Sequence, residues 1–130
     1  MIVVDASALL EVLLRTPAAT AVEARLFGEQ QTLHAPHLLD VEVVQVLRRY
    51  AHAGEIDEGR GAEAIADLAD FPVRRYPHGF LLPRVWSLRH NFTAYDSIYI
   101  ALAEALNARF LTCDERLAKA ISDRVDIELA

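Results

Sequence analysis

The sequence predicts an α/β domain with a short, mainly parallel central sheet flanked by helices. Short apolar runs, several of them rich in β-branched residues, alternate with longer segments in which apolar residues recur every three or four positions. The chain has 130 residues, of which 53% are hydrophobic and 25% are charged, as is typical of one globular domain. We therefore expect a single domain over residues 1–130.

The N-terminal quarter of the chain is expected to contain two strands and two helices. Residues 2–5 (IVVD) are apolar and β-branched, which is typical of a strand buried on both faces. Residues 6–14 and 17–27 follow as helices, the second with a proline in its first turn. Residues 32–34 are predicted to form a short strand.

A long amphipathic helix is predicted over residues 37–53, ending at Gly54. Its apolar stripe consists of Leu39, Val43, Val46 and Tyr50. Residues 57–68 form a weaker helical pattern, and residues 72–76 are a plausible strand.

The C-terminal part repeats the alternation of helix and strand. Residues 82–90 and 93–106 are predicted helices, and residues 109–112 are a predicted strand. A helix over residues 115–121 and a last strand over residues 126–129 complete the chain. Because helices separate most successive strands, the strands are expected to run parallel.

Charge and cysteine content exclude several classes of protein. The formal net charge is -6 and Lys119 is the only lysine, so no basic surface for non-specific nucleic-acid binding is expected. Cys113 is the only cysteine, which excludes intrachain disulfides and makes a reducing, cytoplasmic setting the default. The apolar N-terminal stretch could suggest an export signal, but it contains Asp5 and Glu11 and lacks a basic segment before it, so no export signal is expected. No stretch reaches the roughly 18 apolar residues of a membrane span, so no membrane association is expected.

Two aspartates come directly after predicted strands. Asp5 ends the run IVVD, and Asp114 follows FLTC. In an open parallel sheet, ligands bind at the carboxyl ends of strands, so these two side chains are candidates for a site. Aspartate is also a good residue for capping the start of a helix, and either role fits the sequence.

Two further acidic residues are expected on helices. Asp96 lies in a capping-box pattern with Thr93, but it shares a helix face with the apolar residues Tyr99 and Ile100, whereas Ser97 lies on another side. Glu42 lies mid-helix among apolar neighbours, where it either faces a site or keeps its carboxylate in water or paired with Arg49. A carboxylate turned toward a core is costly unless it is paired or bound to a metal.

Carboxylates that converge repel one another, and a hard divalent cation relieves that repulsion. Mg²⁺ and Mn²⁺ prefer oxygen ligands and keep bound waters, which suits the hydrolysis of a phosphodiester. If Asp5, Glu42, Asp96 and Asp114 converge, the sequence therefore predicts a Mg²⁺ or Mn²⁺ site.

The chain resembles PIN-domain ribonucleases, particularly the VapC-type toxins of bacterial toxin–antitoxin pairs. The matching segments are VVDASALL around Asp5, APHLLDVEVVQVLRR around Glu42, TAYDSIYIALAEAL around Asp96 and LTCDERLAKA around Asp114. They span nearly the whole chain in the order and spacing of that family. The resemblance implies one PIN-like nuclease domain.

The resemblance also implies an activity and a set of partners. It implies an endoribonuclease that cleaves RNA with a metal-activated water, using one or two Mg²⁺ or Mn²⁺ ions. Asp5 and Asp96 match the most direct metal ligands of the family, and Glu42 and Asp114 would complete the site or orient the water. The implied partners are an RNA substrate, a second copy of the chain in a homodimer, and a small antitoxin whose C-terminal segment lies across the acidic site.

Some neighbouring positions have less defined roles. Ser7 and Thr112 match positions where family members often carry a hydroxyl beside the site, although capping or strand-end roles fit equally well. Leu117 stands in the region where many members carry a further acidic residue, which leaves the second metal position open. Asp40 is left out of the site because the family glutamate precedes a valine.

Other polar residues are given no functional role. They are His34 and His37, which are separated by a proline and have no cysteine nearby, together with His52, His78, His90 and Cys113. The pairs Arg48–Arg49 and Arg74–Arg75 could contact phosphates, although solvated helix or strand faces are the commoner explanation for such pairs. Two alternative functions remain open. One is a PIN-like module that binds partners without cutting, and the other is a phosphoacceptor receiver domain, which would need paired acidic residues after its first strand.

Overall fold

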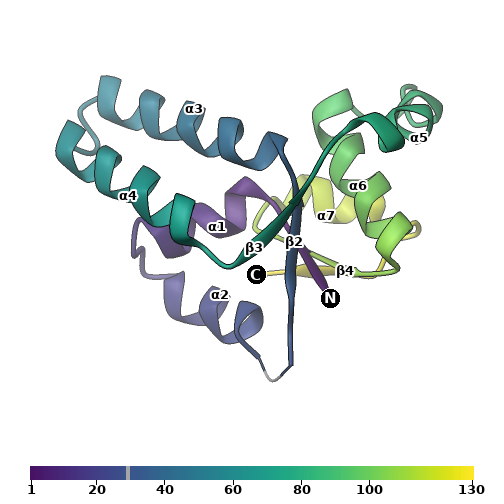
Figure 1. Ribbon diagram of the computed structural model, residues 1–130, viewed down its shortest axis with the longest axis horizontal. Coiled ribbons are helices and arrows are strands. Elements are labelled where there is room, and N and C mark those ends of the chain that lie inside the picture. Colours follow the sequence, from purple (N-terminus) through teal and green to yellow (C-terminus); the bar gives the residue numbers. More distant parts are fainter. Residues whose placement is uncertain (29) are drawn as a thin grey trace.

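The computed structural model describes residues 1–28 and 30–130. Its centre is a five-stranded sheet with the strand order β3-β2-β1-β4-β5, and all four strand pairings are parallel. Figure 1 shows the sheet between two groups of helices. The strands are β1 (Ile2–Val4), β2 (Leu33–Pro36), β3 (Val73–Tyr76), β4 (Arg109–Thr112) and β5 (Ile127–Leu129).

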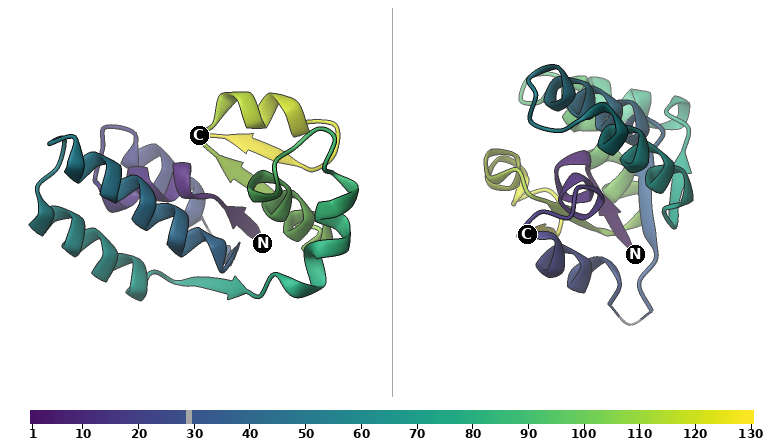
Figure 2. Two further views of the ribbon diagram at one scale, coloured as in Figure 1. Left: turned by 90° about the horizontal axis from the view of Figure 1, so that it is seen from above. Right: turned by 90° about the vertical axis from the view of Figure 1, so that its left-hand side faces the viewer.

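The helices divide between the two faces of the sheet. The first group is α1 (Ala6–Leu13), α2 (Ala19–Leu26), α3 (Leu38–His52) and α4 (Glu58–Asp70). The second is the short 3₁₀ helix η1 (Gly79–Leu81), α5 (Leu82–Ser87), α6 (Ala94–Leu106) and α7 (Glu115–Ile121). Seen from above, α3 and α4 run side by side away from the sheet, with α6 and α7 on its other side (Figure 2). In the part of the chain described here, no helix is long and apolar enough to cross a membrane.

Two apolar cores follow from the alternation of side chains along β1 and β4. Ile2, Val4 and Leu111 face the core formed with α1 to α4, whereas Val3 and Phe110 face the core formed with α5 to α7. All three residues of β1 are buried because helices cover both faces of the central strand. This is the burial expected from its apolar sequence.

Most predicted elements are confirmed, with small shifts in their bounds. The prediction that a proline opens the second helix was wrong, because Ala19 N–H donates to Thr16 O in a turn that contains Pro17, and α2 begins only after that turn. The strand predicted over residues 32–34 extends to Pro36. The helix predicted over residues 82–90 ends at Ser87 and is preceded by η1, whose tighter turn the apolar pattern did not reveal.

Candidate active site

The candidate site lies between β1 and β4, where the order of strand addition reverses: β2 and β3 lie on one side of β1, and β4 and β5 lie on the other. The strand order places β1 beside β4, with Val4 opposite Leu111, although 104 residues (5–108) lie between the end of β1 and the start of β4. Ligand sites of open parallel sheets form at such a switch point, at the carboxyl ends of the strands. Asp5 and Asp114 follow β1 and β4 at this end.

A cavity of about 140 Å³ at this end of the sheet contains every predicted site residue. Its lining residues are Asp5, Ala6, Ser7, Glu42, Asp96, Tyr99, Asp114 and Leu117. The fold thus brings together four carboxylates that are spread over more than a hundred residues of sequence. Leu117, at the position where many family members are acidic, contributes an apolar wall.

Asp5 is the most buried of the four carboxylates, with 7% of its surface exposed. Its Oδ1 accepts hydrogen bonds from Ser7 Oγ (2.6 Å) and from the backbone N–H of Ala8 (3.1 Å). Its Oδ2 accepts from Thr112 Oγ1 (2.5 Å). Asp5 therefore caps α1 as well as lining the cavity, so both roles considered from the sequence apply.

Ser7 and Thr112 form a small hydroxyl network around Asp5. Their oxygens lie 3.2 Å apart, and each also accepts from the backbone that leads into α7. Cys113 N–H donates to Ser7 Oγ (2.9 Å), and Asp114 N–H donates to Thr112 Oγ1 (3.0 Å). The two hydroxyls thus tie the end of β1 to the end of β4 and fix the orientation of the Asp5 carboxylate.

Asp114 and Asp96 lie at the starts of α7 and α6. Asp114 Oδ1 accepts from Leu117 N–H (3.0 Å), which makes it a helix cap on the edge of the cavity. At α6 the cap is Thr93, whose hydroxyl accepts from Asp96 N–H (3.1 Å). The sequence pattern placed Ser97 away from the inward face, but Ser97 is fully buried while Asp96 is half-buried. All residues of α6 from Ser97 to Ala103 are buried, so a single amphipathic stripe does not describe this helix.

Glu42 reaches the cavity from α3 and is held by a residue that the sequence did not identify. Tyr99 on α6 donates its hydroxyl proton to Glu42 Oε1 over 2.6 Å. The alternative pairing of Glu42 with Arg49 does not occur in the structure. The only sequence signal for Tyr99 was its position three residues after Asp96, on the same helix face.

Three of the four carboxylates are harder to ionise than usual. Burial raises the pKa of Asp5, and repulsion from Asp114 adds to this effect. Burial also raises the pKa of Glu42, with repulsion from Asp5 and Asp96, while the hydrogen bond from Tyr99 opposes the increase. Burial and the charge of Asp114 raise the pKa of Asp96. The cavity is therefore a site of concentrated negative charge that a cation would stabilise.

The donor set and the room in the cavity fit a hard divalent cation with bound water. A cavity needs only about 10–15 Å³ to hold one water, well below the 140 Å³ found here. The side chains do not converge on one point: within residues 1–28 and 30–130, no three His, Cys, Asp or Glu side chains are placed as an assembled metal site. Internal hydrogen bonds hold Asp5 and Glu42 in their present orientations, and Asp5 Oδ2, with one donor, retains a free lone pair.

Several residues set aside in the sequence have structural roles. Asp40 accepts two hydrogen bonds from Arg75 Nε (3.0 and 2.9 Å), and Arg75 also donates to Leu68 O (2.7 Å). His34 is buried between Thr32 Oγ1 (2.8 Å) and Tyr76 OH (2.6 Å), which excludes it from a zinc site with His37 in this conformation.

His78 has a structural role as well, and Cys113 has a thiol that is hard to ionise. Leu38 N–H donates to His78 Nε2 (2.9 Å), so His78 supports the start of α3 and is not simply a surface histidine. Burial raises the pKa of Cys113 to about 11, so its thiol stays protonated near neutral pH.

Comparison with known proteins decides the family. The family model described as "PIN domain" matches residues 2–121. The chain belongs to the PIN-domain family. Ribonuclease VapC12 of Mycobacterium tuberculosis (strain ATCC 25618 / H37Rv) is 42% identical over 129 residues, which cover 99% of this chain and 98% of that protein. Ribonuclease VapC1 of the same strain is 41% identical over 128 residues, covering 98% of this chain and 96% of that protein.

Solved structures of PIN-domain proteins share this fold. The crystal structure of Mycobacterium tuberculosis VapC20, described as a sarcin-ricin loop cleaving toxin, matches with a TM-score of 0.72 at 15% identity, covering 98% of this chain and 99% of that chain. VapBC2 from Rickettsia felis, bound to a DNA fragment from its promoter, matches with a TM-score of 0.70 at 12% identity, covering 99% of this chain and 98% of that chain. At these identities the structures support the PIN fold, and the relatives above confirm the VapC-type resemblance.

Proposed function

We propose that this PIN-domain protein is a Mg²⁺- or Mn²⁺-dependent endoribonuclease that acts as the toxin of a toxin–antitoxin pair. The observation that carries the proposal is the single cavity lined by Asp5, Glu42, Asp96 and Asp114. Relatives named VapC ribonucleases, more than 40% identical along nearly the whole chain, support the same activity.

The proposed roles of the four carboxylates are those that the PIN-domain resemblance implies. Asp5 and Asp96 would hold the cation directly, and Glu42 and Asp114 would complete the ligand set or orient a water. When bound, the cation acts as a Lewis acid on the phosphate and lowers the pKa of a bound water. Ser7 and Thr112 keep the Asp5 carboxylate oriented, and Tyr99 does the same for Glu42.

The receiver domain and the non-cutting PIN-like module are the two alternatives to this proposal. The strand order β3-β2-β1-β4-β5 differs from the 2-1-3-4-5 order of receiver-type folds, and the family match is to PIN domains. These two observations exclude a receiver domain. A PIN-like module that binds partners without cutting differs from the proposed enzyme only in chemistry, so an activity assay separates them.

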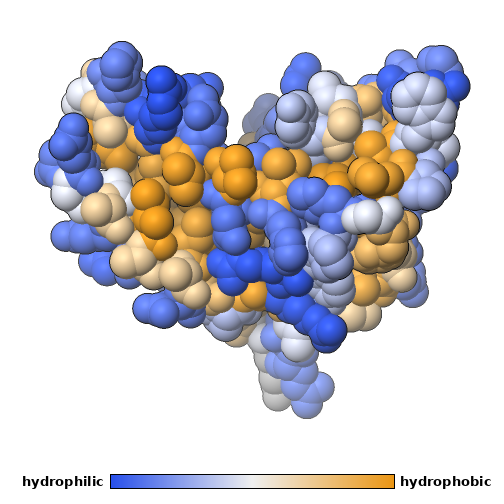
Figure 3. Space-filling view, turned by 45° about the horizontal axis from the view of Figure 1, so that its top comes forward, coloured by the Kyte–Doolittle hydropathy of each residue, from blue (hydrophilic) through white to orange (hydrophobic). Residues whose placement is uncertain are grey.

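The proposed partners besides RNA are a small antitoxin and a second copy of the chain. Large apolar side chains are exposed on α3 (Val41, 67%), on α5 (Trp86, 68%) and at the start of α6 (Tyr95, 63%). Figure 3 shows a notch between the lobe containing α3 and the lobe containing α5, with hydrophobic side chains along it. Exposed apolar surface of this kind is typical of protein interfaces, and we assign it to contacts with these proteins.

The experiment is cleavage of RNA by purified protein with Mg²⁺, with Mn²⁺ and with EDTA. We expect cleavage with either metal and none in EDTA. Asp114→Asn should reduce the rate by orders of magnitude, whereas Glu115→Gln, at the adjacent exposed residue, should not. Because asparagine caps helices about as well as aspartate, the first change leaves the start of α7 stable. Cleavage that persists in EDTA, or equal activity of the two variants, would reject the proposal.

A further inference from the structure

Two more pockets adjoin the carboxylate cavity, one on each side. A pocket of about 330 Å³ between α1 and α3 shares Ala6 and Ser7 with the cavity. A pocket of about 250 Å³ between α6 and α7 shares Asp96 and Leu117 with it. We call them the α1–α3 pocket and the α6–α7 pocket. Because each pocket shares two lining residues with the cavity, the acidic cavity lies between the two pockets.

The two pockets have the same kinds of side chains. The α1–α3 pocket contains Arg49 and the half-buried Tyr50 beside the apolar walls of Leu10 and Val46. Its one carboxylate, Glu11, already accepts a hydrogen bond from Thr16. The α6–α7 pocket contains Arg116 and the half-buried Phe92, and the guanidinium of Arg124 lies 5.5 Å from the Phe92 ring centre.

Arg49 and Arg116 are exposed and form no ion pair within the described residues, although the charge of Arg116 opposes the increase in the pKa of Asp96. The ion pairs of the described residues involve Arg25, Arg60, Arg75, Arg84 and Arg109. In a chain with a formal net charge of -6, attraction for a polyanion has to come from local cations. Two unpaired guanidinium groups, one on each side of a cluster of carboxylates, supply that attraction.

Building on the proposed ribonuclease function, we propose that one unpaired RNA strand crosses all three hollows. Its scissile phosphate lies at the carboxylate cavity, and the nucleotides before and after it enter the α1–α3 and α6–α7 pockets. Arg49 and Arg116 contact the flanking phosphates, and Tyr50 and Phe92 contact the flanking bases.

The apolar and aromatic walls favour an unpaired strand over a duplex. Bases stack on aromatic side chains only when they are turned out of a helix, and aromatic side chains with flanking cations are the common means of binding single strands. In an A-form duplex the bases are paired with each other, which leaves nothing to fill the two pockets. The specificity of the protein would therefore depend on bases that are unpaired around the cleaved bond.

Binding of a fluorescein-labelled, single-stranded RNA 12-mer of mixed sequence, followed by anisotropy, tests this path. All proteins carry Asp114→Asn so that the probe stays intact. Arg49→Gln and Arg116→Gln should each weaken binding at least fivefold, and each should reduce the slope of log affinity against log salt by about 0.7, the value for one contact to a single strand. A duplex of the same sequence should bind more weakly than the single strand.

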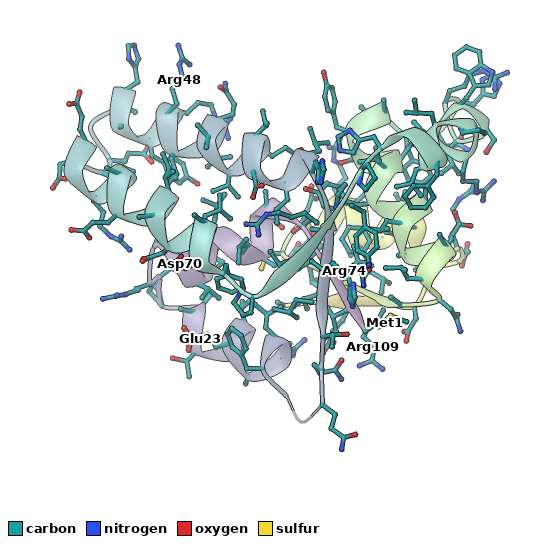
Figure 4. All side chains as sticks on the ribbon, viewed as in Figure 1. Met1, Glu23, Arg48, Asp70, Arg74 and Arg109 are labelled. Carbon is teal, nitrogen blue, oxygen red and sulfur yellow. The ribbon has the colours of Figure 1, made fainter. Side chains whose placement is uncertain are left out.

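Matched controls remove the same charge from the same helices. Arg48 neighbours Arg49 but points away from the body of the molecule (Figure 4), and Lys119 is exposed on α7 outside the pocket. Arg48→Gln and Lys119→Gln should change affinity less than twofold. Equal effects of test and control variants would overturn the path, because they would indicate attraction by overall charge.

Two other results would also overturn the path. One is duplex binding as tight as single-strand binding. The other is normal RNA binding by Arg49→Gln and Arg116→Gln together with lost binding of a protein partner, which would assign the pockets to that partner. Melting curves establish that each variant is folded. Cleavage by the wild-type protein is measured separately, so failure of the path is distinguished from failure of the ribonuclease proposal.

Discussion

Tyr99 on α6 donates a hydrogen bond to Glu42 on α3 over 2.6 Å, which links helices from the two opposite faces of the sheet. Only 2% of the Tyr99 surface is exposed, and its ring stacks on Phe110 with centroids 5.9 Å apart and planes 12° from parallel. The ring is held by packing, so its hydroxyl has a fixed position. This position sets the orientation of the Glu42 carboxylate in the cavity.

Tyr99→Phe should weaken metal binding while leaving the fold intact. The variant keeps the stack on Phe110 and removes only the hydroxyl, so Glu42 loses its fixed orientation. We expect unfolding in EDTA to become easier by about 1 kcal/mol, a typical contribution of one hydrogen bond. We also expect a smaller rise in melting temperature on adding Mg²⁺, measured by a thermal scan across a Mg²⁺ titration.

The control for this prediction is Tyr95→Phe. Tyr95 lies on the same helix but is 63% exposed, and it does not line the cavity. Removal of the Tyr95 hydroxyl should change neither the melting temperature of the protein nor the increase in melting temperature on adding Mg²⁺. If Tyr99→Phe responds to Mg²⁺ as fully as the wild type, Tyr99 does not position Glu42 for the metal.

Thr112→Val should destabilise the protein by about 1–3 kcal/mol, the cost of leaving buried polar groups without partners. Thr112 is fully buried, and it serves both Asp5 Oδ2 and the backbone N–H of Asp114. Valine has a similar shape but cannot donate or accept. Urea unfolding measures the effect, and Thr20→Val on the exposed side of α2 is the control. An equal cost for both variants would show that the hydroxyl network contributes nothing.

Asp96→Asn should change how stability depends on pH. Because the pKa of Asp5, Glu42 and Asp96 is raised on folding, the native state binds these protons more tightly than the unfolded state. The contribution of these groups to the free energy of unfolding therefore falls as pH rises from the unfolded pKa of about 4 through the raised values. The variant has one carboxylate fewer in the cavity, so it should lose less stability over this range.

The measurement is a set of melting curves in EDTA from pH 4 to pH 8. The melting temperature of Asp96→Asn minus that of the wild type should increase with pH and become positive near neutrality. Mg²⁺ should reverse the order, because it stabilises the wild type more. A difference that stays constant or falls with pH would contradict mutual repulsion in the cavity.

Arg75→Gln should affect stability and leave RNA cleavage unchanged per folded molecule. Arg75 pairs with Asp40 and donates to Leu68 O, which joins β3 to α3 and α4 outside the cavity. Both charged side chains are partly exposed, so we expect a loss of about 1–2 kcal/mol. Activity measured well below the melting temperature should match the wild type. If the folded variant loses most of its activity, the ion pair between Arg75 and Asp40 contributes to catalysis and the prediction is wrong.

The sequence predicted the order of elements well because its signals are local. The buried run at residues 2–4 and the caps Asp5, Thr93 and Asp114 determine where elements begin, and the structure contains them. The end of the helix at Ser87 and the start of α2 were misplaced because they depend on turns that hydropathy does not encode.

The candidate site was only partly predictable. The four carboxylates could be chosen because each is an acidic residue beside a predicted core and matches an acidic position of the PIN-domain resemblance, and the fold places them in one cavity. The roles of Tyr99 and His78 depend on contacts with α3 across 57 and 40 residues of sequence, respectively, and no periodicity signals such a contact. The pairing of Asp40 with Arg75 could not be predicted either, because these residues are 35 positions apart in sequence.

The place of β1 at the centre of the sheet has a consequence for synthesis of the protein. β1 is made before both of its neighbours in the sheet, so it has to wait for β2 on one side and for β4, beginning at Arg109, on the other. Asp5 meets Thr112 and Asp114 only after more than a hundred further residues have been made. Since contacts so distant in sequence also form slowly, the acidic cavity is assembled late. A nascent or truncated chain that ends before Asp96 would carry Asp5 and Glu42 without the rest of the site, so an activity that depends on all four carboxylates would arise only once Asp114 has been made.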